Sequence, residues 1–366
     1  MKVMHIASGD LWAGAEKQLY TLLVALKNRG DVQLCAVILN PGTLAQRIRQ
    51  AGIPVLALDE NRQSAASLAR DMDGFIRAER PDLIHTHRSK ENILGGLLAW
   101  RRGIPSLRTQ HGDSEHGDKR LQPRQLVLRL ADLGVGRLLQ RKVVAVSDPL
   151  GEALAQRFTH SRVAVIHNGL DCAPDDDPQP RQTLTDPISI GIVGRLAPVK
   201  RVDLFLRIAR RVRDLPGLPQ PRFLVIGDGP LRDELLALRE TLGLKDDVAM
   251  VGHVDNAEEA IAQLDVLIIC SDHEGLPMVS LEAMKHRTLV LTHPIGGLVQ
   301  LLDGGACGVL ADAQSVEAFA QAISAIIADK AASRRRIALA HQRFERCYSA
   351  AGMAQQYLQL YQSLCR

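Results

Sequence analysis

Aromatic side chains are scarce in this chain of 366 residues, where Phe, Trp and Tyr together make up 3% of the sequence. Proteins that bind single-stranded nucleic acids stack the bases on aromatic rings, and no basic segment here is interleaved with aromatic residues. The hydrophobic content of 46% is mainly aliphatic, and 23% of residues are charged. This composition is typical of a globular α/β protein, and we expect no nucleic-acid partner.

The sequence also lacks paired cysteines and long apolar runs. Its six cysteines are scattered without a Cys-x-x-Cys pair, so we expect neither a zinc site nor a disulfide framework, and Cys270 as a small buried residue. No stretch approaches the roughly 18 apolar residues of a membrane-spanning helix. The N-terminal residues 1–7 predict a strand rather than a signal peptide. We therefore expect a cytoplasmic protein.

Length and patterning predict two domains. Short apolar runs alternate with helical patterns over residues 2–168 and again over 188–292, which indicates two parallel, doubly wound sheets. We expect two Rossmann-like domains that face each other across a cleft. The predicted boundaries are an N-terminal domain over 1–168, a Pro- and Asp-rich linker over 169–187, a second domain over 188–345, and a C-terminal helix within 346–366 that packs back on the first domain.

Positive charge is concentrated in the first part of the chain. Residues 1–168 contain 24 Lys and Arg against 16 Asp and Glu, a net charge of +8, and the rest contains 21 against 25, a net charge of −4. The segment Lys119–Lys142 has seven cations and one Asp on a partly helical, amphipathic pattern. It is either a solvated helix face or a contact with an anionic membrane surface or acceptor.

The loops after the strands are the places to look for a site, because open α/β sheets bind ligands outside the carboxyl ends of their strands. The first loop, Ser8–Glu16, is neither a dinucleotide fingerprint nor a P-loop, but its Gly14 lets backbone N–H groups approach an anion at a helix N-terminus. The loop after residue 193 contains Arg195 and Lys200, which can neutralise two adjacent phosphates or form a structural salt bridge. We interpret Arg201 and Lys285 as surface charges.

A third loop combines carboxylates with a helix start. Glu274-Gly-Leu-Pro-Met278 follows an apolar strand, Pro277 suits the first position of a helix, and Glu282 lies about five residues along that helix. Because the rise is roughly 7.5 Å, Glu274 and Glu282 are expected to contact different parts of one elongated ligand rather than to form a catalytic dyad.

These motifs together resemble the retaining GT-B glycosyltransferases of family four. The resemblance is carried by Glu274-x7-Glu282 with Gly275-Leu-Pro277 between them, by Gly194-Arg-x4-Lys200 upstream, and by weaker motifs in the same order. The weaker motifs are Gly14-Ala-Glu16, His85-Thr-His87, His111-Gly112, Val146-Ser147, Asn168-Gly169 and Gly227-Asp-Gly-Pro230.

The resemblance implies a role for each matching residue. Arg195 and Lys200 would hold the donor diphosphate, Glu274 the hydroxyls of the donor sugar, and Glu282 the ribose of the nucleotide. His111 would lie close to the reacting sugar, with a strand-end packing role as the alternative, and at least one of His85 and His87 would be a packing residue. The remaining expected contacts with the donor are Gly14, Gly229, His253, Val254, Gly275, Leu276, Pro277 and Met278.

The resemblance also implies catalysis without a metal or another cofactor. Metal-dependent transferases of the other common fold use Asp-x-Asp, and Asp71-Met-Asp73 matches that string inside a predicted helix, where we interpret it as chance. We expect a hexosyl unit to move from a nucleotide sugar, UDP-linked by expectation, to a polysaccharide or lipid-linked acceptor of the cell envelope. The alternatives are a sugar-nucleotide epimerase or hydrolase of the same fold, or a non-catalytic nucleotide-sugar-binding module.

Overall fold

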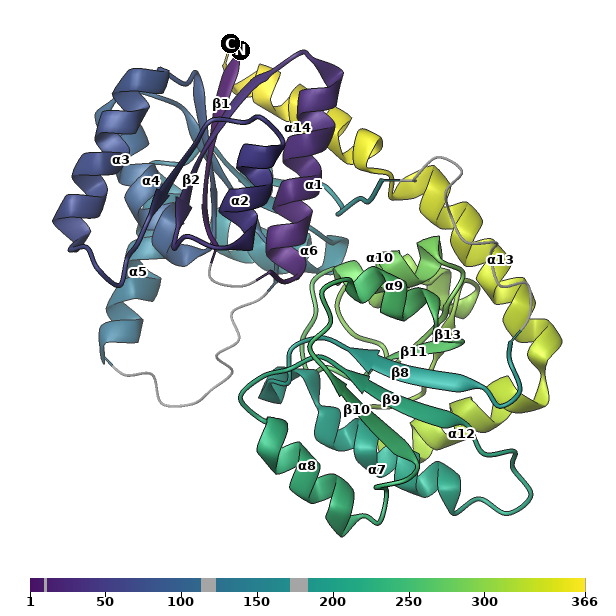
Figure 1. Ribbon diagram of the computed structural model, residues 1–366. Coiled ribbons are helices and arrows are strands. Elements are labelled where there is room, and N and C mark those ends of the chain that lie inside the picture. Colours follow the sequence, from purple (N-terminus) through teal and green to yellow (C-terminus); the bar gives the residue numbers. More distant parts are fainter. Residues whose placement is uncertain (10–11, 113–122, 172–183, 366) are drawn as a thin grey trace. The chain divides into compact units, whose positions relative to one another are not determined.

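The chain forms two compact units, which we describe separately. The computed structural model describes residues 1–9, 12–112, 123–171 and 184–365. One unit comprises Met1–Asp171 with Ala350–Arg366, and the other comprises Cys172–Ser349 (Figure 1). Most of the predicted linker over 169–187, and the basic residues Lys119 and Arg120, lie outside the described residues. Among the described helices, none is long and apolar enough to cross a membrane.

The first unit is built on a seven-stranded sheet of order β3-β2-β1-β4-β5-β6-β7, in which every pair is parallel. Its strands are β1 (Lys2–Ser8), β2 (Gln33–Leu39), β3 (Val55–Leu58), β4 (Leu83–His87), β5 (Ser106–Gln110), β6 (Lys142–Ala145) and β7 (Val163–Val165). Its helices are α1 (Gly14–Arg29), α2 (Thr43–Gln50), α3 (Ala65–Glu79), α4 (Ser89–Arg101), α5 (Pro123–Leu138), α6 (Asp148–Phe158), the 3-10 helix η1 (His160–Arg162) and α14 (Ala350–Leu364). The central strands are buried along almost their whole length, as expected for a parallel sheet covered on both faces.

The second unit repeats this plan with a six-stranded parallel sheet of order β10-β9-β8-β11-β12-β13. Its strands are β8 (Ser189–Val193), β9 (Arg222–Ile226), β10 (Val248–Gly252), β11 (Val266–Ile269), β12 (Leu289–Thr292) and β13 (Val309–Leu310). Its helices are η2 (Pro198–Lys200), α7 (Val202–Arg213), α8 (Arg232–Thr241), α9 (Ala257–Ala262), α10 (Met278–Lys285), α11 (Leu298–Leu301), η3 (Asp303–Gly305), α12 (Val316–Ala328) and α13 (Lys330–Cys347). Cys270, expected to be a small buried residue, is 0% exposed. Helix α7 shows why the elements form: Phe205, Ile208, Ala209 and Val212 recur at helical spacing and are fully buried.

The C-terminal helix α14 belongs to the core of the first unit, although the second unit separates the two in sequence. It packs beside α1, and Met353, Tyr357 and Tyr361 are buried there (Figure 1). The amide of Ala350 donates to the carbonyl of Leu170 at 2.8 Å, which fixes the start of the helix. Fully buried tyrosines at helical spacing therefore attach the end of the chain to its first domain.

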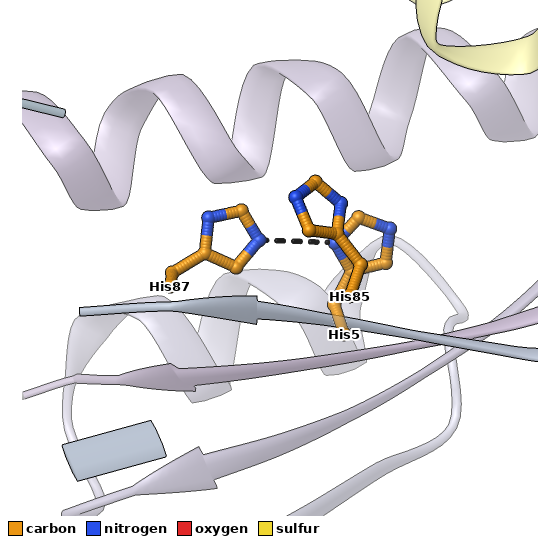
Figure 2. Close-up of side chains that lie close together, drawn as sticks. All are labelled: His5, His85 and His87. Atoms are coloured by element: carbon orange, nitrogen blue, oxygen red, sulfur yellow. Dashed lines mark hydrogen bonds between the residues drawn. The ribbon is translucent and has the colours of Figure 1, made fainter. Parts of the chain in front are cut away.

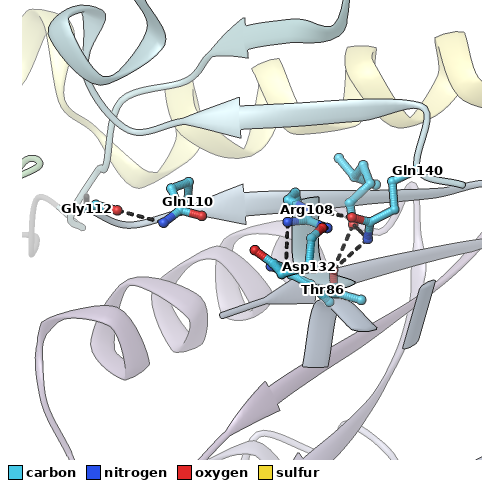
Figure 3. A network of polar contacts seen from close by, with 8 residues as sticks. Thr86, Arg108, Gln110, Gly112, Asp132 and Gln140 are labelled. Atoms are coloured by element: carbon cyan, nitrogen blue, oxygen red, sulfur yellow. Dashed lines mark hydrogen bonds and ion pairs between the residues drawn. The ribbon is translucent and has the colours of Figure 1, made fainter. Parts of the chain in front are cut away.

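A buried arginine connects β5 to α5. Figure 3 shows Arg108, 1% exposed, donating to the carboxylate of Asp132 at 2.7 Å and to the side chain of Gln140. Gln140 in turn donates to Thr86 at 2.9 Å. Burial lowers the pKa of Arg108 and raises the pKa of Asp132, so desolvation opposes a pair that the hydrogen bonds hold together.

Removing one charge of this pair should be costly. Asp132→Asn leaves the buried Arg108 guanidinium without a counter-charge, and we expect a loss of about 3–5 kcal/mol in the free energy of unfolding, measured by urea denaturation. The control is Asp31→Asn, which removes the partner of Arg29 from a pair whose side chains are 52% and 31% exposed. That variant should lose less than about 1 kcal/mol. Equal losses would contradict a structural role for the buried pair.

Candidate functional site

The order of the strands indicates where each unit binds a ligand. In both sheets the order reverses at one point, between β1 and β4 in the first unit and between β8 and β11 in the second. Open α/β sheets bind ligands at this switch point, outside the carboxyl ends of the two strands. In the second unit, residues 194–201 follow β8 and residues 270–277 follow β11. These are the two loops in which the sequence predicts the strongest site residues.

Lys200 and Glu274 come from these two loops and form an ion pair. The Nζ atom of Lys200 lies 2.6 Å from Oε1 of Glu274, and the side chains are 29% and 9% exposed. The amide of Asp272 donates to the carbonyl of Val199 at 2.8 Å, which connects the backbones of the loops. The structure thus brings together an ammonium and a carboxylate that are 74 residues apart in sequence.

Arg195 lies in the loop of Lys200 and is exposed. Within the described part of the chain, its guanidinium has no hydrogen bond or ion pair. Arg201 differs, because it donates to Asp203 and Asp272 at 3.0 Å each, and these bonds raise its pKa. The positive charge that this loop can offer to a ligand therefore comes from Arg195 and Lys200.

Two residues that we expected to be plain surface charges are instead held by carboxylates. Arg201 connects its own helix to the loop after β11 through Asp272. Lys285, 15% exposed, lies 2.6 Å from Glu258 and connects α10 to α9. Both positions stabilise the loops and helices around the site, a role that their sequence positions alone do not indicate.

Helix α10 begins one residue later than the sequence predicts. Pro277 is the N-cap residue, with φ −68° and ψ 133°, so the helix begins at Met278 and not at the proline. Leu276 and Met278 are each 4% exposed and anchor the helix start in the core. Glu282, in the second turn of α10, is 2% exposed. A helix N-terminus, with its unsatisfied N–H groups, therefore lies between the two carboxylates.

Backbone contacts fix the turn at Gly275. The amide of Gly297 donates to the carbonyl of Gly275 at 2.8 Å. Gly296 has φ 49°, and a Cβ atom there would lie 2.0 Å from the carbonyl oxygen of Glu274. The loop after β12 therefore packs against the loop after β11, and only a glycine at position 296 permits this close approach.

Glycines also bring together the loops after β8 and β9. A Cβ atom on Gly227 would lie 1.9 Å from the carbonyl oxygen of Gly194, and one on Gly229 would lie 2.6 Å from that of Leu196. The amide of Leu196 donates to the carbonyl of Asp228 at 2.9 Å. We expected Gly229 to contact the donor, and in the structure it packs against the backbone of Leu196. The predicted base contacts His253 and Val254 follow β10, and the side chain of His253 is 72% exposed.

In the first unit, Gly14 is the first residue of α1 and is exposed. Glu16 of the same helix accepts a hydrogen bond from the amide of Ala13 at 3.3 Å and forms an ion pair with Arg88. The exposed backbone at Gly14 is therefore at a helix N-terminus, as the sequence indicates.

Histidines gather on β1 and β4, at the switch point of the first unit. His5, His85 and His87 lie side by side under the neighbouring helices (Figure 2), and one ring nitrogen of each lies within 4.8 Å of those of the other two. His111, after β5, contacts His87 through Nε2 and Nδ1 at 3.1 Å. Burial lowers the pKa of His5 to about 3 and of His111 to about 4, and lowers the pKa of His85 and His87 well below the usual value.

The hydrogen bonds of His85 argue against a metal at this cluster. Its Nδ1 lies 2.8 Å from the hydroxyl of Tyr361, and its Nε2 lies 2.8 Å from Oγ1 of Thr109. A metal ion would have to displace one of these bonds, so His85 is a packing residue that also holds α14. His5 was missed in the sequence, although a histidine inside an otherwise apolar first strand was a usable signal. In the structure it pairs in register with His85.

Comparisons with known proteins agree with this architecture. The profile described as Glycosyltransferase Family 4 matches residues 12–174, and the profile described as Glycosyl transferases group 1 matches residues 175–343. The galactosyltransferase of Escherichia coli that acts on α-D-GlcNAc-diphosphoundecaprenol is 24% identical over 90% of this chain and 89% of its own. The 2-deoxystreptamine N-acetyl-D-glucosaminyltransferase of Streptomyces fradiae is 26% identical over 91% of this chain and 87% of its own.

Solved structures show the same fold. The structure of HepE of Anabaena in complex with UDP matches this chain with a TM-score of 0.82 at 21% identity. The match covers 100% of both chains. The lipopolysaccharide outer core galactosyltransferase WaaB has a TM-score of 0.74 at 16% identity, again with complete coverage of both chains. Since the two family profiles together extend over nearly the whole chain, the protein belongs to the GT-B glycosyltransferases of family four, in the group 1 type.

Proposed function

We propose that this protein is a retaining, metal-independent glycosyltransferase that moves a hexosyl unit from a nucleotide sugar, UDP-linked by preference, to a glycan or lipid-linked acceptor. The observation that carries this proposal is the Lys200–Glu274 ion pair at the switch point of the second unit, with the exposed Arg195 in the same loop. The relatives described above act on nucleotide-linked galactose, or transfer N-acetylglucosamine, according to their names, and one structural neighbour binds UDP.

The chemistry follows from the charges of this site. A departing nucleoside diphosphate gains negative charge, and positioned cations stabilise that charge where it develops. Lys200 has three N–H donors, so its ammonium can keep Glu274 and still donate to a phosphate oxygen. The guanidinium of Arg195 and the N-terminal amides of α10 add further donors. No metal ion is needed to neutralise the leaving group in this scheme.

Retention needs no separate base in this proposal. The acceptor hydroxyl attacks the anomeric carbon from the face that the leaving diphosphate vacates, and its proton passes to the departing phosphate oxygen. Glu274 is proposed to hold hydroxyls of the donor sugar, and Glu282 the ribose. His111 is proposed to lie beside the reacting sugar, and Gly14, Gly229, His253, Val254 and residues 275–278 are proposed to contact the rest of the donor.

Two alternative functions predict a different fate for UDP-sugar. An epimerase or hydrolase would turn over UDP-sugar at full rate without any acceptor. A non-catalytic binding module would bind UDP-sugar and leave it unchanged. The sequence contains all four of Arg195, Lys200, Glu274 and Glu282. Their joint presence favours the transferase, because a module that only binds a nucleotide sugar needs fewer of these groups.

Removing either cation should slow turnover. We expect Arg195→Ala and Lys200→Ala each to lower kcat by at least about tenfold, equivalent to about 1.4 kcal/mol of transition-state stabilisation. The measurement is UDP release from UDP-sugar in the presence of an acceptor fraction. Lys245→Ala is the matched control, since Lys245 is exposed and precedes β10 at the opposite edge of the sheet. Wild-type rates in either site variant would remove the diphosphate assignment.

Association with an anionic membrane is a separate part of the proposal. Helices α4 and α5 pack together. Six apolar side chains on these helices are 42–64% exposed: Leu97, Trp100, Leu126, Val127, Leu128 and Leu130. Apolar side chains next to a cationic segment are the features that hold a protein at a membrane surface. The cationic part of Lys119–Lys142 is only partly within the described residues.

Flotation with vesicles tests this part. We expect the protein to float with vesicles that contain anionic lipid, and to lose most of that binding in a Lys119/Arg120/Arg124 charge-reversal variant or in Trp100→Ser with Leu130→Ser. Leu339→Ser is the control, because Leu339 is 47% exposed on α13 in the other unit. Failure of the wild type to float, or unchanged flotation of the charge-reversal variant, would remove the membrane from the proposal without touching the transferase.

A further inference from the structure

An ion pair joins the two loops at the switch point of the first unit. Glu16 lies in the first turn of α1, after β1, and Arg88 directly follows β4. Nη2 of Arg88 contacts Oε1 of Glu16, and the side chains are 44% and 2% exposed. Lys200 and Glu274 form the corresponding pair in the second unit. Each unit therefore presents a partly exposed cation, held by a buried carboxylate, at the place where open α/β sheets bind their ligands.

The backbone of Arg88 is strained. Its φ of 70° and ψ of 163° lie in a region that glycine populates and other residues rarely adopt. Arg88 is the N-cap residue of α4, but its side chain makes no capping hydrogen bond. A glycine would suit this backbone better, so the local structure gives no reason for an arginine here. Strain of this kind is typical of functional sites, and the guanidinium is the group to consider.

The guanidinium keeps most of its donors for a ligand. Arginine has five N–H donors in one plane, and Glu16 accepts a hydrogen bond from Nη2 of Arg88. Within the described part of the chain, the side chain of Arg88 has no second hydrogen bond or ion pair. The planar fork of a guanidinium matches two oxygen atoms of one phosphate or carboxylate. A ligand can therefore bind Arg88 while the pair with Glu16 stays intact.

Few negative charges near Arg88 oppose an anionic ligand. Glu60 is paired with Lys90 at 3.2 Å. Burial raises the pKa of Glu91 to about 7, which reduces its negative charge at neutral pH. The first part of the chain also has an excess of positive charge. These charges favour an anionic ligand over a cationic one.

We propose that Arg88 is a specificity-determining residue of the acceptor site and binds an oxyanion of the acceptor, a phosphate or a carboxylate, with Glu16 as its positioning residue. This inference rests on the proposed function, in which the second unit binds the donor. A transferase has two substrates, and the switch point of the first unit is then the site for the second one. Acceptors that carry a negative group are therefore preferred over neutral ones.

Titration of the whole protein with inorganic phosphate tests the oxyanion site without an acceptor. In ¹⁵N-arginine protein, the Nε–Hε signal of Arg88 is assigned by its loss in Arg88→Lys. We expect this signal to shift and saturate as phosphate is added at constant ionic strength, both without UDP and with saturating UDP. The control is the signal of Arg29, which pairs with an exposed aspartate of the same unit and should not saturate.

A parallel titration with acetate distinguishes the two oxyanions. Saturation with phosphate alone indicates a phosphate on the acceptor, and saturation with acetate alone indicates a carboxylate. An Arg88 signal that responds to neither anion, or that moves no more than the signal of Arg29, would overturn the proposal.

Two substitutions at Arg88 separate binding from structure. The background is Glu16→Gln, which removes the buried charge and keeps an oxygen that accepts from the amide of Ala13. Arg88→Gly and Arg88→Ala both delete the guanidinium, but only Arg88→Gly relieves the backbone strain. We expect Arg88→Gly to have the higher Tm of the two. Both should raise the acceptor concentration for half-maximal UDP release about tenfold, as for a lost charge-assisted hydrogen bond, without a change in donor KM.

The outcomes for the two proposals differ. Unchanged acceptor dependence in both folded variants would refute the role in acceptor binding, and a lower Tm for Arg88→Gly than for Arg88→Ala would refute the strain at this position. Absence of sugar transfer by the wild type would refute the proposed function. Because the titration needs neither donor sugar nor acceptor, saturation of the Arg88 signal would even then support the oxyanion site.

Discussion

Parallel pairing of two central strands is the constraint on which each unit depends. In the second unit β8 pairs with β11, and their registered residues bring the ends of the two strands to one edge of the sheet. The loops that follow must then meet, although they are more than 70 residues apart in sequence. The same pairing of β1 with β4 brings His5 beside His85 in the first unit. The ion pair of one unit and the histidine cluster of the other are both consequences of this topology.

Close backbone packing makes the loops precise enough to hold charged groups. Gly227 and Gly296 lie where any Cβ atom would overlap a neighbouring carbonyl oxygen. Hydrogen bonds between the loops, such as that from Asp272 to Val199, add to this packing. Because the loops are held by backbone, Arg195 can remain exposed and Lys200 can be held by a single carboxylate. In the proposed function, cations supported in this way need little reorganisation when a ligand binds.

The sequence predicts much of this architecture because its signals are local. Alternating apolar runs and helical patterns predict the strands, and the Asp71-Met-Asp73 string lies inside α3, as expected. The sequence also places Lys200 and Glu274 in loops that follow strands, but it does not predict the ion pair between them. The structural roles of Arg201 and Lys285 could not be predicted, because their partners Asp272 and Glu258 are distant in sequence. The clustering of the histidines was missed for the same reason: the neighbours of His5 come from β4 and α14, which are distant in sequence.

In the proposed function, the diphosphate of a nucleotide lies on the loops after β8 and β11 of the second unit. Hydrogen–deuterium exchange of the protein with and without UDP tests it most directly, because it maps backbone amides without any knowledge of the acceptor. We expect UDP to slow exchange in residues 194–201 and in residues 274–282. Slowed exchange confined to other segments, with these two loops unchanged at saturating UDP, would contradict it.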